Sequence, residues 1–140
     1  MTFQEEFPEL SDAAVPGSAD QEQVLQSMVP ELNYAVVTGI IKRRKALALS
    51  RFGVPVLHIL VENRLKTYFD NPETIVSEIE VDAWGKLASS LDEKLHPGDA
   101  ILIEGRLAHR KTNDRTGGTH FKTLLRARRI QLIFNAERKA

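Results

Sequence analysis

Basic side chains are concentrated in one stretch of the chain. Residues 106–129 contain eight Lys or Arg and a single acid, Asp114. Two apolar-rich runs, 100–107 and 121–133, flank a polar loop with two glycines, which is typical of a β-hairpin. A long basic hairpin suits the phosphates of a polyanion, and a solvated edge hairpin whose charges deter aggregation is the alternative. The eight bases are Arg106, Arg110, Lys111, Arg115, Lys122, Arg126, Arg128 and Arg129.

The formal net charge of zero hides a division of charge along the chain. Residues 1–32 hold seven of the 19 acids and no Lys or Arg, so residues 33–140 carry all 19 bases and a net charge of +7. This asymmetry indicates a basic binding domain with an acidic arm. The first half of the arm is expected to be disordered, with a short helix over Asp20–Met28. The arm either folds over the basic groove as a DNA mimic or serves as a solubilising tail.

Composition excludes several classes of protein. The 140 residues contain no cysteine, which rules out a disulfide framework, a Cys-based zinc site and a thiol nucleophile. The four histidines lack metal-ligand spacing, and no glycine-rich loop with a lysine is present for nucleotides. We therefore expect neither an enzyme nor a bound metal or cofactor. No secretion signal or membrane-length apolar run is found, and a cytoplasmic protein is expected.

The hairpin belongs to a series of alternating apolar segments that predicts a small barrel. Gly39, inside the first apolar run, suggests a bulge or bend of a strand that curls. Strands are expected over residues 34–41, 54–62 and 75–84, a loop over 63–72, a helix over 86–95 and then the two hairpin strands. This order predicts an all-β fold, a five-stranded OB-fold Greek-key barrel with one short helix between its third and fourth strands. The expected divisions are the acidic arm 1–32, the OB-fold domain 33–135 and a short tail 136–140.

Three motifs in this order resemble the bacterial single-stranded-DNA-binding protein (SSB) family. They are Asn33-Tyr-Ala-Val-Val-Thr-Gly39, Trp84-Gly-Lys-Leu-Ala88 and Gly98-Asp-Ala-Ile-Leu-Ile-Glu-Gly-Arg-Leu107 followed by Arg110-Lys111. The runs 53–64 and 129–133 are closer to the family's primosomal replication protein N (PriB)-like members. The resemblance covers residues 33–133, and it implies an OB fold that binds single-stranded DNA.

The aromatic positions of this chain depart from the SSB pattern. The family stacks bases on several aromatic residues, and only Trp84 keeps an aromatic there; the other positions fall on Glu78, near Lys66 and on Thr112. This departure also favours the PriB-like members, in which the resemblance implies binding through hairpin-loop lysines and one tryptophan. Carried over, these are Lys111, Lys122 and Trp84.

The residues themselves extend this set. Trp84 falls on the polar face of its strand and should point outwards, a core tryptophan being the alternative. The basic run 42–45 either binds phosphates or forms a dimer rim or a solvated edge, and Tyr68 could supply an aromatic from the loop. The candidate nucleic-acid-binding residues are Trp84, Arg110, Lys111, Arg115, Lys122, Arg106, Lys42, Arg44, Lys66 and Tyr68.

The expected function is single-stranded DNA binding without catalysis, in DNA replication or replication restart. The expected partners are single-stranded DNA, replication or primosome proteins and further copies of the chain, as a homo-oligomer in which a dimer is favoured over a tetramer. The alternative is an OB-fold protein–protein adaptor of the replication machinery with weak or no DNA binding. RNA remains open as a ligand, because stacking and phosphate contacts distinguish the sugar poorly.

Overall fold

A computed structural model describes residues 19–69 and 71–136. The chain divides into two units, residues 1–32 and 33–140. In the first unit, the helix expected over Asp20–Met28 is present as α1 (Ala19–Met28), and none of its residues is buried. The disorder expected for the start of the arm concerns residues outside the described ranges, and so does the tail beyond residue 136.

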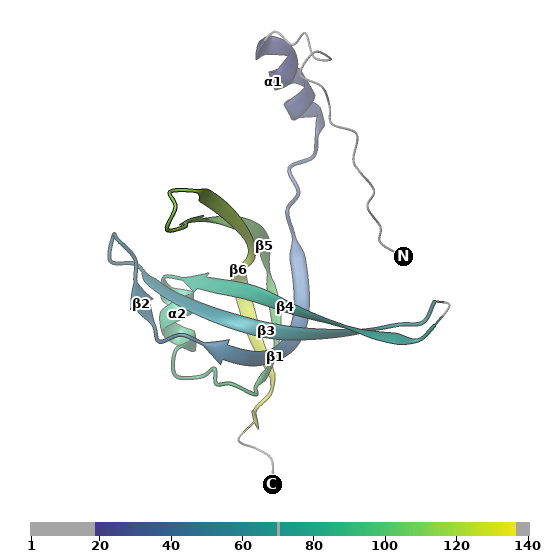
Figure 1. Ribbon diagram of the computed structural model, residues 1–140, viewed down its shortest axis with the longest axis vertical. Coiled ribbons are helices and arrows are strands. Elements are labelled where there is room, and N and C mark those ends of the chain that lie inside the picture. Colours follow the sequence, from purple (N-terminus) through teal and green to yellow (C-terminus); the bar gives the residue numbers. More distant parts are fainter. Residues whose placement is uncertain (1–18, 70, 137–140) are drawn as a thin grey trace. The chain divides into compact units, whose positions relative to one another are not determined.

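The second unit is a closed five-stranded barrel, as predicted (Figure 1). Neighbouring strands are antiparallel around the barrel except β4 and β6, which run parallel, and the β1–β3 pairing closes it. This order of pairings, with α2 inserted between β4 and β5, is that of an OB fold. The barrel strands are β1 (Ala35–Arg44), β3 (Pro55–Thr67), β4 (Glu73–Trp84), β5 (Ala100–Asn113) and β6 (Thr119–Phe134), and a short β2 (Ala48–Leu49) pairs with β3.

Two glycines allow the strands to approach closely where the barrel bends. A Cβ atom on Gly39 would lie 2.6 Å from the carbonyl oxygen of Glu62, and one on Gly105 would lie 2.0 Å from that of Arg126. Register shifts leave Lys42 of β1 unpaired with β3 and Arg128 of β6 unpaired with β5, and these two β-bulges increase the local bend. At Gly39, where a bend was expected, β1 therefore lies so close to β3 that a side chain would not fit.

The core consists of the inward-facing apolar residues of all five barrel strands. Leu57, Ile59 and Val61 of β3 are buried, and they pack with apolar residues of the other strands and of α2. The helix α2 (Lys86–Leu91) is shorter than the predicted span 86–95. Beyond Leu91 the chain continues as a turn, in which Arg44 donates to the carbonyl oxygens of Asp92 and Leu95 and the Asp99 carboxylate accepts the His96 N–H.

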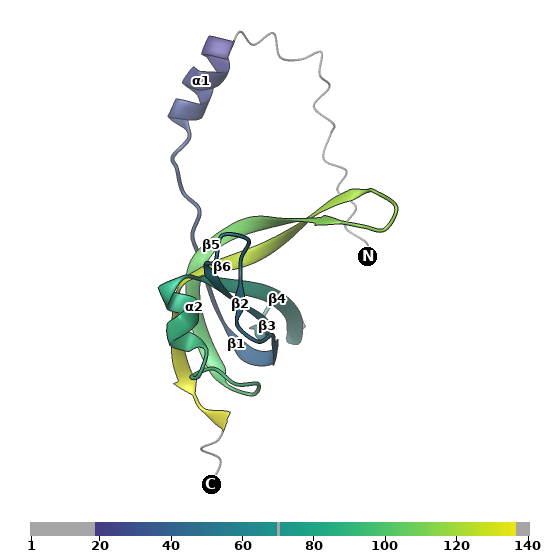
Figure 2. The same ribbon diagram turned by 90° about the vertical axis from the view of Figure 1, so that its left-hand side faces the viewer.

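Two hairpins extend beyond the barrel (Figures 1 and 2). The prediction of a loop over residues 63–72 was wrong for residues 63–67, because the β3–β4 ladder continues to the pair Thr67 and Glu73. The β5–β6 ladder likewise continues to the pair Asn113 and Thr119. Within the described ranges, no helix has the length and apolar character needed to cross a bilayer.

Candidate nucleic-acid interface

The side chains of β3 and β4 that point away from the core form a polar surface, which we call the outer face. Strand alternation sends Ile79, Val81 and Ala83 inwards and their neighbours outwards. The ladder then sets one residue of β3 opposite one residue of β4. The outer face consists of the pairs Val56 and Trp84, His58 and Asp82, Leu60 and Glu80, and Glu62 and Glu78.

Half of the residues of the outer face are acidic, and cations from β1, β3, β5 and β6 pair with them. Lys122 Nζ lies 2.6 Å from Glu80 Oε1, and Arg110 Nη2 lies 3.1 Å from Glu80 Oε2. The bond from Lys122 lowers the pKa of Glu80, with further lowering by the charge of Arg110. The remaining pairs are Lys42 with Glu78 and Glu62, Arg64 with Glu62, and Arg126 with Asp82.

Trp84 lies at the edge of this surface and is 39% exposed. The guanidinium of Arg126 stands 5.2 Å from the centre of the indole ring, a cation–π arrangement. The same guanidinium donates to both carboxylate oxygens of Asp82, which is only 2% exposed. Asp82 therefore holds Arg126, and Arg126 in turn holds the indole in an outward orientation.

The tip of the β5–β6 hairpin presents cations without acidic partners. Asp114 accepts the backbone N–H groups of Thr116 and Gly118 and binds the imidazole of His120. These bonds, with that from the Thr116 hydroxyl first, lower the pKa of Asp114 and fix the turn. Within the described part of the chain, neither Lys111 nor Arg115 forms an ion pair, so both charges are exposed to solvent.

The other predicted residues lie at separate places on the barrel and its hairpins. Arg44 points to the end of α2, where it pairs with Asp92, and it is largely withdrawn from the surface. Lys66 is exposed at the end of β3, and Tyr68 is 83% exposed at the turn of the β3–β4 hairpin. Arg106 is exposed on β5, opposite Arg126. The outer face thus gathers Trp84, Lys42, Arg110 and Lys122, with Lys111 and Arg115 at the hairpin beside it.

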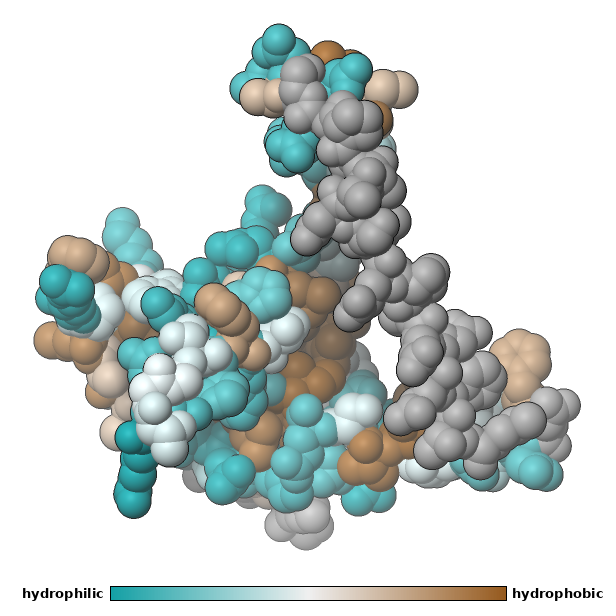
Figure 3. All heavy atoms as spheres, turned by 45° about the horizontal axis from the view of Figure 1, so that its top comes forward, coloured by the Kyte–Doolittle hydropathy of each residue, from teal (hydrophilic) through white to brown (hydrophobic). Residues whose placement is uncertain are grey.

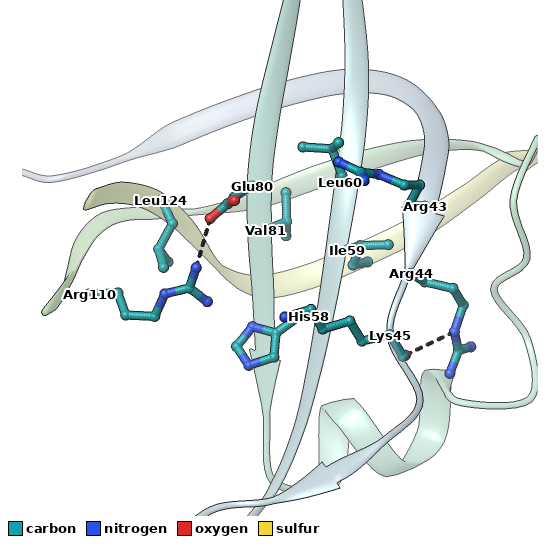
Figure 4. A pocket seen from close by; sticks show the side chains of 10 residues that line it. All are labelled: Arg43, Arg44, Lys45, His58, Ile59, Leu60, Glu80, Val81, Arg110 and Leu124. Atoms are coloured by element: carbon teal, nitrogen blue, oxygen red, sulfur yellow. Dashed lines mark hydrogen bonds and ion pairs between the residues drawn. The ribbon is translucent and has the colours of Figure 1, made fainter. Parts of the chain in front are cut away.

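Sequence reasoning missed a pocket of about 380 Å³ in the outer face, where it is lined by His58, Leu60 and Glu80. Arg43, Lys45 and His58 line it together with Arg110 (Figure 4). The sequence prediction selected Lys42 and Arg44 from the same basic run. The bulge leaves Lys42 without a partner in the ladder and sets Arg43 opposite Leu60 of the outer face. No motif in the basic run indicates the position of this bulge.

The barrel part of the chain is similar in sequence to known proteins. Residues 32–133 match the model of the Single-strand binding protein family. A thylakoid-associated single-stranded DNA-binding protein from Synechocystis sp. is 36% identical over 64 residues, which cover 46% of this chain and 47% of that protein.

Solved structures show the same fold at low sequence identity. A deletion mutant of the single-stranded DNA binding protein from Thermus aquaticus is 18% identical with a TM-score of 0.64, covering 75% of this chain and 52% of that one. The protein PriB from Ralstonia solanacearum is 18% identical with a TM-score of 0.55, covering 72% of this chain and 98% of that one. The chain spans about half the length of the Synechocystis and Thermus proteins.

The family match extends over nearly the whole barrel, from just before β1 to the penultimate residue of β6. The pairing order of the strands and the solved structures agree with it. The chain belongs to the single-strand binding protein family.

Proposed function

We propose that the protein binds single-stranded DNA along the outer face and the β5–β6 hairpin, without catalysis. The observation that carries this proposal is the combination, on an OB barrel of this family, of an outward Trp84 with the unpaired hairpin cations Lys111 and Arg115. OB folds use the corresponding strands and hairpin loop to grip oligonucleotides. Membership of the family supports it, and so does the similarity to the single-stranded DNA-binding proteins of Synechocystis and Thermus.

The two kinds of contact have different roles. Lys111 and Arg115 attract phosphates at long range and at low cost, because no acid has to be displaced. The Nη2 atom of Arg110 and the Nζ atom of Lys122 bind a phosphate only if it replaces Glu80. A base stacked on Trp84 adds about 1–3 kcal/mol, in a manner that tolerates any base sequence. Binding is therefore expected to depend on salt and to show little sequence preference.

The proposed biological setting is DNA replication or replication restart, in contact with replication or primosome proteins. The fold that the chain shares with a PriB protein supports the restart setting. We also propose that the chain acts as a homo-oligomer, with a dimer favoured. Tyr34, directly before β1, and Val36 and Ile40 on the outward side of β1 are exposed in the single chain and would be covered in such an assembly.

A protein–protein adaptor is the second candidate function. The observation that favours it is the β3–β4 hairpin, where Leu65, Tyr68, Phe69, Ile75 and Val76 are all exposed. On the face drawn in Figure 3, hydrophobic residues reach the surface between hydrophilic ones. Exposed aromatic residues at a hairpin end suit a protein partner as well as a base.

A binding assay separates the two functions. Fluorescence anisotropy of a labelled oligo-dT would be followed as protein is added at low salt, beside a labelled duplex of the same length. Single-stranded DNA binding predicts saturable binding of the oligo-dT that weakens as salt is raised, and weaker binding of the duplex. Absence of oligo-dT binding at low salt would contradict the proposed function and favour the adaptor.

A further inference from the structure

The pocket in the outer face has an apolar wall and several basic residues around it. Ile59, Leu60, Val81 and Leu124 supply its apolar wall, and four of its ten lining residues are Arg or Lys (Figure 4). Glu80 is the single acid among those lining residues. The combination of apolar wall and convergent polar groups is typical of a ligand site.

Two of the four cations are available to a ligand. Arg44 is turned towards α2 and bound to Asp92, and Arg110 is bound to Glu80 through Nη2. For Arg43 and Lys45, no ion pair is found in the described part of the chain. Among the residues that the structure describes, the pocket therefore has an excess of positive charge that no acidic side chain neutralises.

The guanidinium group of Arg110 has a hydrogen-bond donor without an acceptor. Its Nε atom is buried and has no hydrogen-bond partner within the described ranges. A buried donor without an acceptor costs free energy, and such a group in a native fold calls for an explanation. An acceptor oxygen of a bound ligand in the pocket would satisfy it.

His58 lies in the pocket between Lys45 and Arg110 in the view of Figure 4. Burial lowers the pKa of His58, the charges of Arg110 and Lys45 lower it further, and the carboxylates of Asp82 and Glu80 oppose this. The imidazole is therefore neutral near pH 7 and can accept or donate a hydrogen bond. A bound anion would raise the pKa of His58, because it would offset the two cations.

We propose that this pocket binds a phosphate group of the DNA strand, held by Arg43, Lys45 and the Nε atom of Arg110. The apolar wall formed by Leu60 and Leu124 would carry the adjoining sugar or base. This inference rests on the proposed function, since the strand that crosses the outer face supplies the phosphate. It adds a subsite that continues the DNA path from the hairpin towards β1.

The test removes the two free cations from the full chain. Arg43→Gln and Lys45→Gln would be made singly and together, with Lys94→Gln as the matched control because Lys94 is exposed and does not line the pocket. The double variant should bind oligo-dT about tenfold more weakly at low salt, with a salt slope reduced by about 0.7, the value for one phosphate. The Lys94→Gln variant should bind like the wild type.

A second measurement uses His58 as a reporter in the wild-type chain. NMR titration of the imidazole should show its pKa rising when oligo-dT is bound, and the rise should be smaller in the Arg43→Gln/Lys45→Gln variant. Wild-type affinity and slope in the double variant, or an unchanged pKa of His58 in the complex, would overturn the phosphate site while leaving the proposed function intact. A wild-type chain that binds no oligo-dT would overturn both.

Discussion

Arg110 and Lys122 lie directly opposite each other in the β5–β6 ladder, and both bind the carboxylate of Glu80. Two like charges in this position repel each other, so the carboxylate stabilises the base of the hairpin. It also occupies cations that a phosphate would otherwise contact. In the proposed mode of binding, the protein's own acids would compete with DNA for part of the binding surface.

Neutralising Glu80 should strengthen DNA binding. In Glu80→Gln, Arg110 and Lys122 lose their carboxylate partner and become available to phosphates, and we expect an increase in affinity for oligo-dT of about fivefold at low salt. Anisotropy titrations would measure it. The control is Glu73→Gln, since Glu73 is exposed and forms no ion pair in the part of the chain that the structure describes. An unchanged or lower affinity in a folded Glu80→Gln chain would contradict the competition.

Removing the free cations of the hairpin tip should have the opposite effect. The Lys111→Gln/Arg115→Gln variant is expected to bind about tenfold more weakly at low salt, and its salt slope should fall by about 1.4, which corresponds to two phosphates. Affinities at several salt concentrations test this. Equal slopes for variant and wild type would show that the tip does not meet phosphates.

Arg44 should behave differently from the other predicted cations. Arg44→Gln removes the bonds to the carbonyls of Asp92 and Leu95 and to the Asp92 carboxylate, so we expect a loss of about 1–3 kcal/mol in the free energy of unfolding. The salt slope of DNA binding should stay unchanged in the folded variant. Denaturant unfolding and anisotropy measure the two effects, and a reduced slope with full stability would refute the structural role.

The free energy of unfolding should decrease as pH falls below about 6.5. The folded state holds the pKa of His58 below its ordinary value of 6.5, so the unfolded state takes up the proton first and is favoured as pH falls. The lowered pKa values of Glu78 and Glu80 affect stability at lower pH, around and below their ordinary value of 4.5. Denaturant unfolding at pH 7.0 to 5.0 should show this loss in the wild type and a flatter profile in His58→Gln. Identical profiles would contradict the assignment.

Gly105 should be required for barrel closure. In Gly105→Ala the new Cβ would lie 2.0 Å from the Arg126 carbonyl oxygen, and the backbone shift that follows should cost about 1–3 kcal/mol. Thermal or denaturant unfolding measures this cost. Thr38→Ala, an exposed position on the adjoining β1, serves as the control and should change stability by less than about 0.5 kcal/mol. Equal stabilities of the two variants would argue against the close approach.

Local patterns in the sequence were sufficient to predict the architecture of the barrel. Apolar alternation located the strands, and the order of strands and helix identified the OB barrel. The polar face of Glu78, Glu80, Asp82 and Trp84 followed from alternation alone and is the outer face. The extension of β3 through Asn63–Thr67 was missed because that segment has few apolar residues, and it becomes a strand through its ladder with β4.

Pairing between distant residues could not be predicted. The sequence shows that Lys42, Arg110 and Lys122 are basic, but not that they reach Glu78 and Glu80 across the barrel surface. The bulge in β1 also decides which members of the basic run face the pocket. Such features depend on three-dimensional packing, whereas the residue types that bind phosphate are visible in the sequence.

The central claim is that single-stranded DNA lies on the outer face beside Trp84, and the fluorescence of this residue tests it most directly. Trp84 is the one tryptophan in the sequence, so its emission reports on that site without labels. Titration with oligo-dT should quench it, and the binding constant should fall with salt at a slope of about −0.7 for each phosphate neutralised. Unchanged emission, together with unchanged anisotropy of a labelled oligo-dT, would contradict the account.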